Sequence, residues 1–515
     1  MTSRFGRAID ALEAALIRSS ALRKWLRSRR WCGETLGMRS EMSIKDRLLL
    51  AESRDEAIVF FLALARDAGA PRLLNLPLSL TSTRIESDAF EFALGSEAFF
   101  VTDAEDREAF ARFLADGFRR SPKLPTRSGD HLRFHGESLG TFRSWTPLTG
   151  GDTSNLLVRI AASEREIIYK SYKLLEPSNR EPRILERLHQ CGFAHVPRFL
   201  GDLSLGRGEE RLVLGVVTEA VDSEDLFHWL LEGWRSASDS ASPPRAEFET
   251  TSLELIGQLG ETTADLHDSL SERKTGPFQI ETFTREDMRS AYRIATSNLT
   301  DSLRMLARQA HGDGGDQVDS AMGARTSLLD HRRAIEEMLT LLELSVGTAK
   351  TVTHGDLHLG QVLRSRRDGS LFFIDFEGEP ERVAGQRSMK LPPLRDVATM
   401  NRSFSYVRHF AWRDRLAARD LGSFGLPDHE ESLATGEALL RRLRSWETDA
   451  METYSRRYLA RTNLYPGLDT GIARQAIRAW MMEKALYELR YELKHRPQNI
   501  SIALEGILSL ANRGP

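Results

Sequence analysis

THGDLHLGQ, the stretch at residues 353–361, and IDFEG, at residues 374–378, together decide the fold. The first places an Asp two residues after a His and an amide side chain five residues further on, and the second ends an apolar run that predicts a strand. Phosphoryl transfer from a nucleotide uses one carboxylate to accept the proton of the attacking hydroxyl, and an amide oxygen and a second carboxylate to hold Mg²⁺. Asp356 suits the first role, and Gln361 and Asp375 suit the second, because Mg²⁺ prefers oxygen ligands.

Two other interpretations of residues 353–361 stay open from the residues alone. Gly355 and Gly360 are common loop residues, so the segment could be a polar turn between two buried strands. His354 and His358 are four residues apart, which allows a zinc site only if a helix puts both on one face. The glycines argue against such a helix, and the amide and the second Asp at their offsets favour phosphoryl transfer.

Composition and length narrow the classes of protein that fit. The 515-residue chain has a net charge of −3 and 28% charged residues, which suggest two or three domains and neither nucleic-acid binding nor disorder. Two cysteines, Cys32 and Cys191, cannot form a disulfide framework, so a reducing cytoplasm is the expected location. No apolar run approaches the roughly 18 residues of a transmembrane helix. Residues 1–31 predict an amphipathic surface helix.

The N-terminal quarter predicts a small α+β domain. Short apolar segments at residues 47–51, 57–65, 72–80 and 98–102 predict strands, and residues 106–118 predict a helix. Residues 121–136 are polar and contain Pro and Gly, so we expect a linker there.

The segment after this linker contains candidate nucleotide-binding residues. Strands predicted at 145–148 and 156–160 flank TGGDTSN at 149–155, where Thr153, Ser154 and Asn155 could contact phosphates, although such residues are common in any hairpin. A further strand ends at Lys170, which is either a phosphate-binding lysine or a solvated edge-strand lysine. Glu181, in the helix that follows, is its expected partner, and Glu186 is the competing one.

The middle of the chain predicts a connection between two lobes. A β-branched strand at 211–218 leads through Glu219 and Val221 into a helix, and backbone groups there could contact adenine. Stretches 236–252 and 311–320 are expected to be surface loops. His267 ends a predicted helix and is expected to be a core or capping residue. Residues 473–494 predict the longest uninterrupted helix.

Taken together, these motifs resemble the aminoglycoside phosphotransferase branch of the eukaryotic-like kinases, which carries His-Gly-Asp-Leu-His followed by Asn. More narrowly, LGQ at 359–361 with DFEGEP at 375–380 is similar to the bacterial maltokinases and the related actinobacterial glucosamine kinases. PLRDVA at 393–398, EKALYE at 483–488, YE at 491–492 and RP at 496–497 are similar to further motifs of this group. WL at 25–26 and RW at 30–31 resemble the start of their N-terminal cap.

This resemblance implies an α+β architecture, namely a two-lobed protein-kinase-like fold with an N-terminal α+β cap domain. It places an N-terminal extension at residues 1–21 and the cap at 22–120. An ATP-binding small lobe follows at 137–222, and a mainly helical large lobe for catalysis and sugar binding follows at 223–515.

The resemblance also implies roles for single residues. Asp356 corresponds to the catalytic base, and Gln361 and Asp375 correspond to the Mg²⁺ ligands, with ATP as the donor. Residues 152–155 take the place of a phosphate loop that is Gln-Ser-Asn-Thr-Ser-like in the relatives. Leu156 and Leu157 stand where the relatives have hydroxyl residues, so phosphate contacts there must come from the backbone.

Substrate-binding residues are expected in two places, and they are His358, Lys484, Tyr487, Glu488 and Tyr491. His358 lies in the catalytic motif, and the other four lie on the predicted C-terminal helix. Lys484 and the two tyrosines share one face of the C-terminal helix, where a sugar could stack on the rings and bond to the polar groups. Without the resemblance, the better interpretation of these tyrosines would be core aromatics of an amphipathic helix.

The implied activity is ATP-dependent phosphorylation of a sugar hydroxyl, and the C-terminal motif favours maltose as acceptor, giving maltose 1-phosphate. Maltokinases place a Trp two residues after RP, where this chain has Asn499. The alternative acceptor is glucosamine or another amino sugar or aminoglycoside, since Glu483, Glu488 and Glu492 lie on the same predicted helix. A further alternative is a catalytically silent protein that binds nucleotide or sugar.

The expected partners follow from this interpretation. We expect a small-molecule sugar substrate, no nucleic acid and no membrane. The protein is expected to act as a monomer or in functional association with a trehalose- or maltose-converting enzyme.

Overall fold

The computed structural model describes the chain except for residues 1–3, 30, 33–35, 38–39, 67–70, 85, 87, 149–154, 177–178, 207–210, 240–243, 311–314, 418–429 and 513–515. Helices and antiparallel sheets make up the described residues, which confirms the predicted α+β class. The chain divides into two compact units, residues 1–189 with 197–221, and residues 190–196 with 222–515. None of the described helices has a segment long and apolar enough to cross a bilayer.

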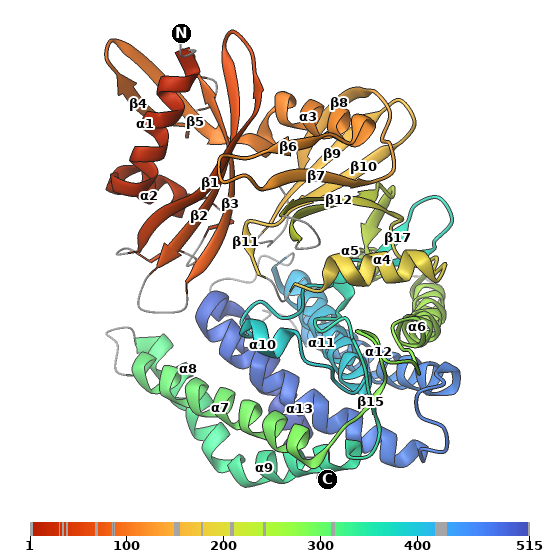
Figure 1. The fold of residues 1–515 in the computed structure, drawn as a ribbon. Helices are drawn as coiled ribbons and strands as arrows, with labels where there is room; N and C mark the ends of the chain where they lie inside the picture. Colours follow the sequence, from red (N-terminus) through yellow and green to blue (C-terminus); the bar gives the residue numbers. More distant parts are fainter. Residues whose placement is uncertain are drawn as a thin grey trace. The chain divides into compact units, whose positions relative to one another are not determined.

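The first unit contains a six-stranded antiparallel sheet in the order β1-β2-β3-β5-β4, with β11 paired to β3 (Figure 1). The two central strands β2 and β3 are buried almost throughout, because they are apolar along most of their length. The strands are β1 (Glu41–Glu52), β2 (Glu56–Arg66), β3 (Arg72–Thr81), β4 (Phe90–Leu94), β5 (Glu97–Asp103) and β11 (Leu174–Leu175).

Two N-terminal helices, α1 (Arg4–Arg18) and α2 (Ser20–Ser28), complete the core of this sheet. Phe5, Leu12 and Leu16 on α1 are buried in the same apolar cluster as the strands. Burying a side chain of this size is worth about 1.5–3 kcal/mol, so α1 contributes substantially to the stability of the sheet. Residues 4–21, which fall in the segment expected as an N-terminal extension, therefore share the core of this sheet.

A seven-stranded antiparallel sheet completes the first unit, in the order β6-β7-β12-β13-β10-β9-β8. The linker prediction for residues 121–136 is wrong, because two of these strands lie there. Leu132 and Phe134 alternate with polar residues and are buried, while the turn residues lie between the two strands. The strands are β6 (Lys123–Pro125), β7 (His131–Gly136), β8 (Phe142–Leu148), β9 (Leu156–Ala162), β10 (Glu166–Ser171), β12 (Phe199–Gly206) and β13 (Leu212–Glu219), with η2 (Ala104–Asp106), α3 (Glu108–Arg120) and α4 (Glu181–Gln190).

The second unit is mainly helical. Its helices are α5 (Leu226–Asp239), α6 (Pro244–Ser269), α7 (Arg285–Gln309), α8 (Gly315–Asp330), α9 (Arg332–Thr340), η3 (Leu341–Ser345), η4 (Leu359–Gln361), α10 (Ala384–Arg387), α11 (Leu394–Ala417), α12 (Glu430–Arg461), α13 (Thr470–His495), η5 (Pro497–Asn499) and α14 (Ile500–Asn512). The loop prediction for residues 236–252 is wrong over most of its length, because Phe248 packs against Trp229 and Trp234 and anchors the first turns of α6. The loop predicted at 311–320 likewise gives way to helix from Gly315.

Helix α13 lies at the centre of this unit and packs against α7, α11 and α14 (Figure 1). It begins after Asp469, whose side chain accepts a hydrogen bond from the backbone N–H of Ile472 at 3.0 Å. Most of its residues from 473 to 489 are buried, and the buried set includes charged side chains. Buried charges require partners, so α13 fixes the positions of the ionic groups around it.

Short strands position the two motifs that the sequence singled out. β14 (Ser223–Asp225), β17 (Val362–Ser365) and β18 (Leu371–Phe373) form one antiparallel sheet, and β15 (Glu281–Thr282) pairs with β16 (Ala349–Lys350). The strand predicted before Asp375 is present as β18. The motif at 353–361 precedes β17, so both motifs lie at the ends of neighbouring strands.

Candidate active site

The segment that carries Asp356 is held by a buried carboxylate, that of Asp396 on α11. Asp396 accepts hydrogen bonds from the backbone N–H of His354 at 2.7 Å and from that of Gly355 at 3.1 Å. The Gly355 backbone has φ +88°, a conformation that suits glycine, so the chain can turn sharply just before Asp356. Burial would raise the pKa of Asp396, but its bonded and charged neighbours, His267 first among them, lower it.

His267 is buried, as predicted for a core residue. Its Nε2 lies 3.1 Å from the Asp396 carboxylate, and its Nδ1 lies 3.0 Å from the hydroxyl of Tyr458. The imidazole therefore holds the carboxylate that in turn holds the Asp356 segment.

The two histidines of the motif stabilise the loop itself. His354 Nε2 donates to the carbonyl of Ile374 at 2.9 Å, which links the segment carrying Asp356 to the one carrying Asp375. His358 accepts a hydrogen bond from the backbone N–H of Gly360 at 3.1 Å, and burial lowers its pKa. Residues 353–358 are not helical, and among the described residues neither His belongs to a group of three metal-ligating side chains. The zinc interpretation therefore has no support.

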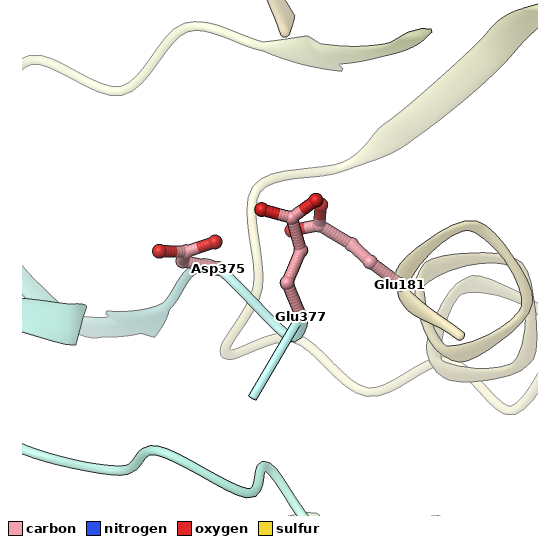
Figure 2. Close-up of side chains that lie close together, drawn as sticks. All are labelled: Glu181, Asp375 and Glu377. Atoms are coloured by element: carbon pink, nitrogen blue, oxygen red, sulfur yellow. The ribbon is translucent and has the colours of Figure 1, made fainter. Parts of the chain in front are cut away.

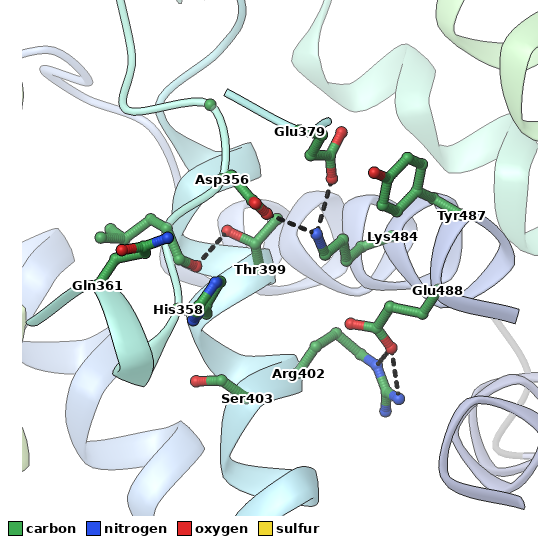
Figure 3. A network of polar contacts seen from close by, with 12 residues as sticks. Asp356, His358, Gln361, Glu379, Thr399, Arg402, Ser403, Lys484, Tyr487 and Glu488 are labelled. Carbon is green, nitrogen blue, oxygen red and sulfur yellow. Dashed lines mark hydrogen bonds and ion pairs between the residues drawn. The ribbon is translucent and has the colours of Figure 1, made fainter. Parts of the chain in front are cut away.

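Lys484 is the direct partner of Asp356 (Figure 3). Its ammonium donates to Oδ1 of Asp356 at 3.0 Å and to Oε1 of Glu379 at 2.7 Å. Burial alone would lower the pKa of Lys484, but these two carboxylates outweigh burial and raise it. The residue predicted to bind substrate thus carries a permanent positive charge between two carboxylates.

A buried ionic network extends from this lysine into the second unit. Arg395 donates to Glu379 at 2.7 Å and to Glu483 at 3.0 Å, and Arg382 donates to the same two carboxylates. Burial would raise the pKa of Glu379, but Arg382, Arg395 and Lys484 hold it well below its usual range. Every charge in the network is paired, which is the condition for burying charges at tolerable cost.

The metal-ligand candidates lie together in the second unit. Gln361 Nε2 donates to Oδ2 of Asp375 at 3.0 Å, which leaves the Gln361 amide oxygen as its possible ligand atom. A carboxylate oxygen of Glu377 lies within 4.8 Å of one of Asp375 (Figure 2). Asp375 has φ +66°, uncommon for a residue other than Gly and often found at functional sites. This oxygen-rich set fits Mg²⁺.

In the first unit, the predicted pair of Lys170 and Glu181 is present. Lys170 Nζ donates to Oε2 of Glu181 at 2.8 Å, and the hydroxyl of Tyr172 donates to the same oxygen at 2.6 Å. Glu181 opens α4 and is buried (Figure 2). The partner of Lys170 is therefore Glu181 rather than the competing Glu186.

The other nucleotide candidates are placed only in part. Thr153 and Ser154 lie outside the described residues, whereas Asn155 is buried just before β9. The backbone N–H of Glu219 donates to the carbonyl of Arg198 at 2.9 Å, so this group already has a partner in the sheet. Val221 ends the first unit. It follows Ala220, whose backbone N–H donates to the backbone carbonyl of Glu166 at 2.9 Å.

Of the remaining substrate candidates on α13, Tyr487 and Tyr491 lie side by side, with ring centroids 6.2 Å apart and planes inclined by 19°. Tyr487 is buried, and its hydroxyl accepts a hydrogen bond from the backbone N–H of Glu381 at 3.3 Å. Glu488 is buried and paired, because Arg402 donates to its Oε2 at 2.8 and 3.0 Å (Figure 3). The other oxygen of Glu488, Oε1, is therefore the atom that could contact a ligand.

Sequence reasoning missed the residues that support Asp356. Glu379, Arg395 and Asp396 were quoted only as parts of motifs shared with relatives, and no role was assigned to them. For Arg395 and Asp396 the signal was their charge between the apolar Leu394 and Val397. Glu379 lies between Gly378 and Pro380 and gave no such signal.

The network makes a prediction about stability. Glu379→Gln leaves three buried cations short of one carboxylate, so we expect the free energy of unfolding at pH 7 to fall by about 3–5 kcal/mol. Because the folded-state pKa of Glu379 is depressed, its contribution is present above the unfolded value of about 4.3 and is lost as the pH falls toward the folded value. The free energy of unfolding, measured by urea titration at pH 7, 5 and 3.5, should fall more steeply with decreasing pH for the wild type than for the variant.

Glu343→Gln is the control for this experiment, because Glu343 is exposed and its ion pair with Arg285 spans 3.4 Å. It should change the free energy of unfolding by less than about 0.5 kcal/mol and keep the wild-type slope with pH. Equal slopes for wild type and Glu379→Gln would contradict a depressed pKa at Glu379.

Comparison with known proteins gives the family. The model described as "Phosphotransferase enzyme family" matches residues 144–434, which is more than half of the chain. A glucosamine kinase from Streptacidiphilus jiangxiensis is 27% identical over 234 residues, which are 45% of this chain and about half, 47%, of that relative. A glucosamine kinase from Mycolicibacterium smegmatis is 22% identical over 410 residues, 79% of this chain and 89% of that relative.

Solved structures share the fold. A glucosamine kinase in crystal form A superposes with a TM-score of 0.60 at 20% identity, over 100% of this chain and 99% of that one. A glucosamine kinase in complex with glucosamine, ADP and inorganic phosphate gives a TM-score of 0.56 at 19% identity, over 96% and 99%. With the family match over more than half of its length, the chain belongs to the phosphotransferase enzyme family.

Proposed function

We propose that this protein is an ATP-dependent amino-sugar kinase whose acceptor is glucosamine. The observation that carries the proposal is that the two sequence relatives named above are glucosamine kinases, one of them aligned over 79% of this chain. Neither is a maltokinase, so the comparisons favour glucosamine over maltose, which the C-terminal motif alone had favoured. Asn499, where maltokinases have a Trp, agrees with this choice.

In this proposal, Asp356 is the catalytic base. Lys484 holds Oδ1 of Asp356, so Oδ2 is the oxygen that faces the acceptor hydroxyl. Asp356 takes the hydroxyl proton while the acceptor oxygen bonds to the γ-phosphorus, the bond from that phosphorus to the bridging oxygen breaks, and ADP leaves. The hydrogen bonds from the loop to Asp396 keep Asp356 in place without substrate.

Gln361, Asp375 and Glu377 would hold Mg²⁺. When bound, the ion neutralises charge on the phosphates. The hydrogen bond between Gln361 and Asp375 fixes the two side chains in advance, which reduces the ordering needed when the ion binds. In the first unit, Lys170 would neutralise the α- and β-phosphates, and Glu181 and Tyr172 would hold its ammonium in position.

The acceptor is proposed to contact α13. Tyr491 is only partly buried and would stack on the C–H face of a sugar, and the buried Tyr487 beside it supports its ring. Oε1 of Glu488 is the carboxylate oxygen available to an ammonium group, although Arg402 beside it offsets part of its charge. A neutral acceptor gains nothing from that oxygen as an ionic partner, so this contact would favour an amino sugar.

The acceptor is tested by ATP-dependent phosphorylation of glucosamine, N-acetylglucosamine, maltose, glucose and an aminoglycoside. We expect kcat/KM for glucosamine to exceed that for every other acceptor, and by about tenfold or more for N-acetylglucosamine, because acetylation removes the positive charge. Glu488→Gln should reduce the ratio of kcat/KM for glucosamine to kcat/KM for glucose.

Two outcomes would contradict this assignment. Higher kcat/KM for maltose would restore maltose as the acceptor. Binding of ATP with Mg²⁺ but no turnover of any acceptor would favour the catalytically silent alternative, which the altered residues Leu156 and Leu157 of the phosphate loop had motivated.

The role of Lys484 is tested by Lys484→Met, which keeps the length of the side chain and removes its charge. We expect kcat to fall by about tenfold or more with every acceptor, because Asp356 loses the donor that orients it. The KM for ATP should change by less than about threefold. The control is Lys494→Met on the same helix, where the exposed ammonium pairs with Glu381 at 3.1 Å. A loss confined to KM for the sugar would instead make Lys484 a substrate-binding residue.

A further inference from the structure

The strand that carries Lys170 belongs to two sheets of the first unit. As β10 it pairs with β9 and β13 in the seven-stranded sheet, and four residues after Lys170 it pairs as β11 with β3 in the six-stranded sheet. Between these pairings, the backbone N–H of Tyr172 donates to the carbonyl of Leu214, and the carbonyl of Lys173 accepts from the N–H of Asn75. Backbone hydrogen bonds therefore hold the segment on both sides along its whole length between the two sheets.

Successive side chains of this segment contact two different carboxylates. Lys170 and Tyr172 both donate to Oε2 of Glu181 on α4, at 2.8 and 2.6 Å. The intervening Ser171 and the next residue, Lys173, donate to Oε1 of Glu105 at 2.7 and 2.6 Å. This alternation follows from extended backbone, in which neighbouring side chains point to opposite sides.

Glu105 lies in the N-terminal part of the chain, in the short helix η2 that follows β5 of the six-stranded sheet. It is fully buried, and so is Ser171, while Lys173 is 1% exposed. Lys173 Nζ also lies 5.1 Å from the ring centroid of Trp31. The carboxylate, the hydroxyl and the ammonium are thus shielded from water. Breaking a hydrogen bond between such buried groups is costly.

Asn75 on β3 adds a second link between the six-stranded sheet and this segment. Its Nδ2 donates to the carbonyls of Tyr172 at 3.0 Å and Leu214 at 3.2 Å, and the side chain is buried. One amide therefore joins β3 to β13 and to the segment after Lys170.

We propose that Glu105 and Asn75 are positioning residues for the ion pair of Lys170 and Glu181, and that the six-stranded sheet thereby sets the affinity for the nucleotide. Side chains at 171 and 173 cannot shift without moving 170 and 172, because all four lie on one extended segment anchored on both sides. A shift of these side chains would move the Lys170 ammonium relative to the phosphates that it is proposed to contact. The proposal rests on the nucleotide role proposed above for Lys170.

Two variants test the links without leaving a buried charge unpaired. Ser171→Ala removes the hydroxyl bonded to Glu105 but keeps the pair of Glu105 and Lys173. Asn75→Ala removes the amide bonds to both carbonyls. The matched control is Ser79→Ala on β3, because the hydroxyl of Ser79 is also fully buried but donates, at 2.8 Å, to Glu56, a carboxylate that pairs with Arg107 rather than with Ser171 or Lys173.

The measurement is the Kd for ADP with Mg²⁺, by calorimetric titration of the full chain, with Tm recorded for each variant. Because no acceptor is needed, the result does not depend on the identity of the sugar. We expect Ser171→Ala and Asn75→Ala each to raise the Kd about three- to tenfold, whereas Ser79→Ala changes it less than about twofold at a similar loss of Tm. In a Lys170→Ala background, Ser171→Ala should raise the Kd no further.

Three results would overturn the proposal, and they are distinguishable. If both test variants behave like Ser79→Ala, the six-stranded sheet does not position the ion pair. If Ser171→Ala weakens ADP binding equally with and without Lys170, its effect does not pass through Lys170. If Lys170→Ala alone binds ADP as the wild type does, the proposed nucleotide role of Lys170 fails, and the positioning role fails with it.

Discussion

The ammonium of Lys484 is the interaction on which the rest of the site depends. It contacts Asp356 and Glu379 at once, at 3.0 and 2.7 Å, and both Lys484 and Glu379 are buried. Arg382 and Arg395 complete the balance of charge through Glu379 and Glu483. A carboxylate fixed this way is ordered before any substrate arrives, so little reorganisation is left for the reaction itself.

This constraint explains features of the second unit that have no other evident reason. Helix α13 carries buried charges among its buried apolar residues, because it supplies both Lys484 and Glu483 to the network. Helix α11 contributes Arg395 to the network and Asp396 to the loop that precedes Asp356, so adjacent residues serve both the ionic and the backbone support. The first unit contains a similar arrangement. There Glu181 and Glu105 each accept hydrogen bonds from two alternate residues of the extended segment 170–173.

The sequence placed Gln361 and Asp375 close enough along the chain to expect them together, and the structure joins them by a hydrogen bond across the hairpin of β17 and β18. Spacing was not enough to predict Lys484 as the partner of Asp356, since 128 residues separate the two. The strands at 123–125 and 131–136 were missed because Pro125 within β6 and the polar, Gly-containing turn at 126–130 indicated a linker more strongly than the short alternation indicated strands. The start of α6 was missed because a single aromatic residue, Phe248, anchors an otherwise polar segment.

The most direct test of the account is single-turnover phosphorylation of glucosamine by Asp356→Asn, with Asp368→Asn, an exposed acid in the turn between β17 and β18, as control. The account predicts that Asp356→Asn lowers the rate of transfer by about 10²–10⁴-fold and leaves the Kd for ATP within about threefold of wild type. It predicts that Asp368→Asn transfers phosphate at the wild-type rate. Transfer by Asp356→Asn at the wild-type rate would contradict the role of Asp356 as the base.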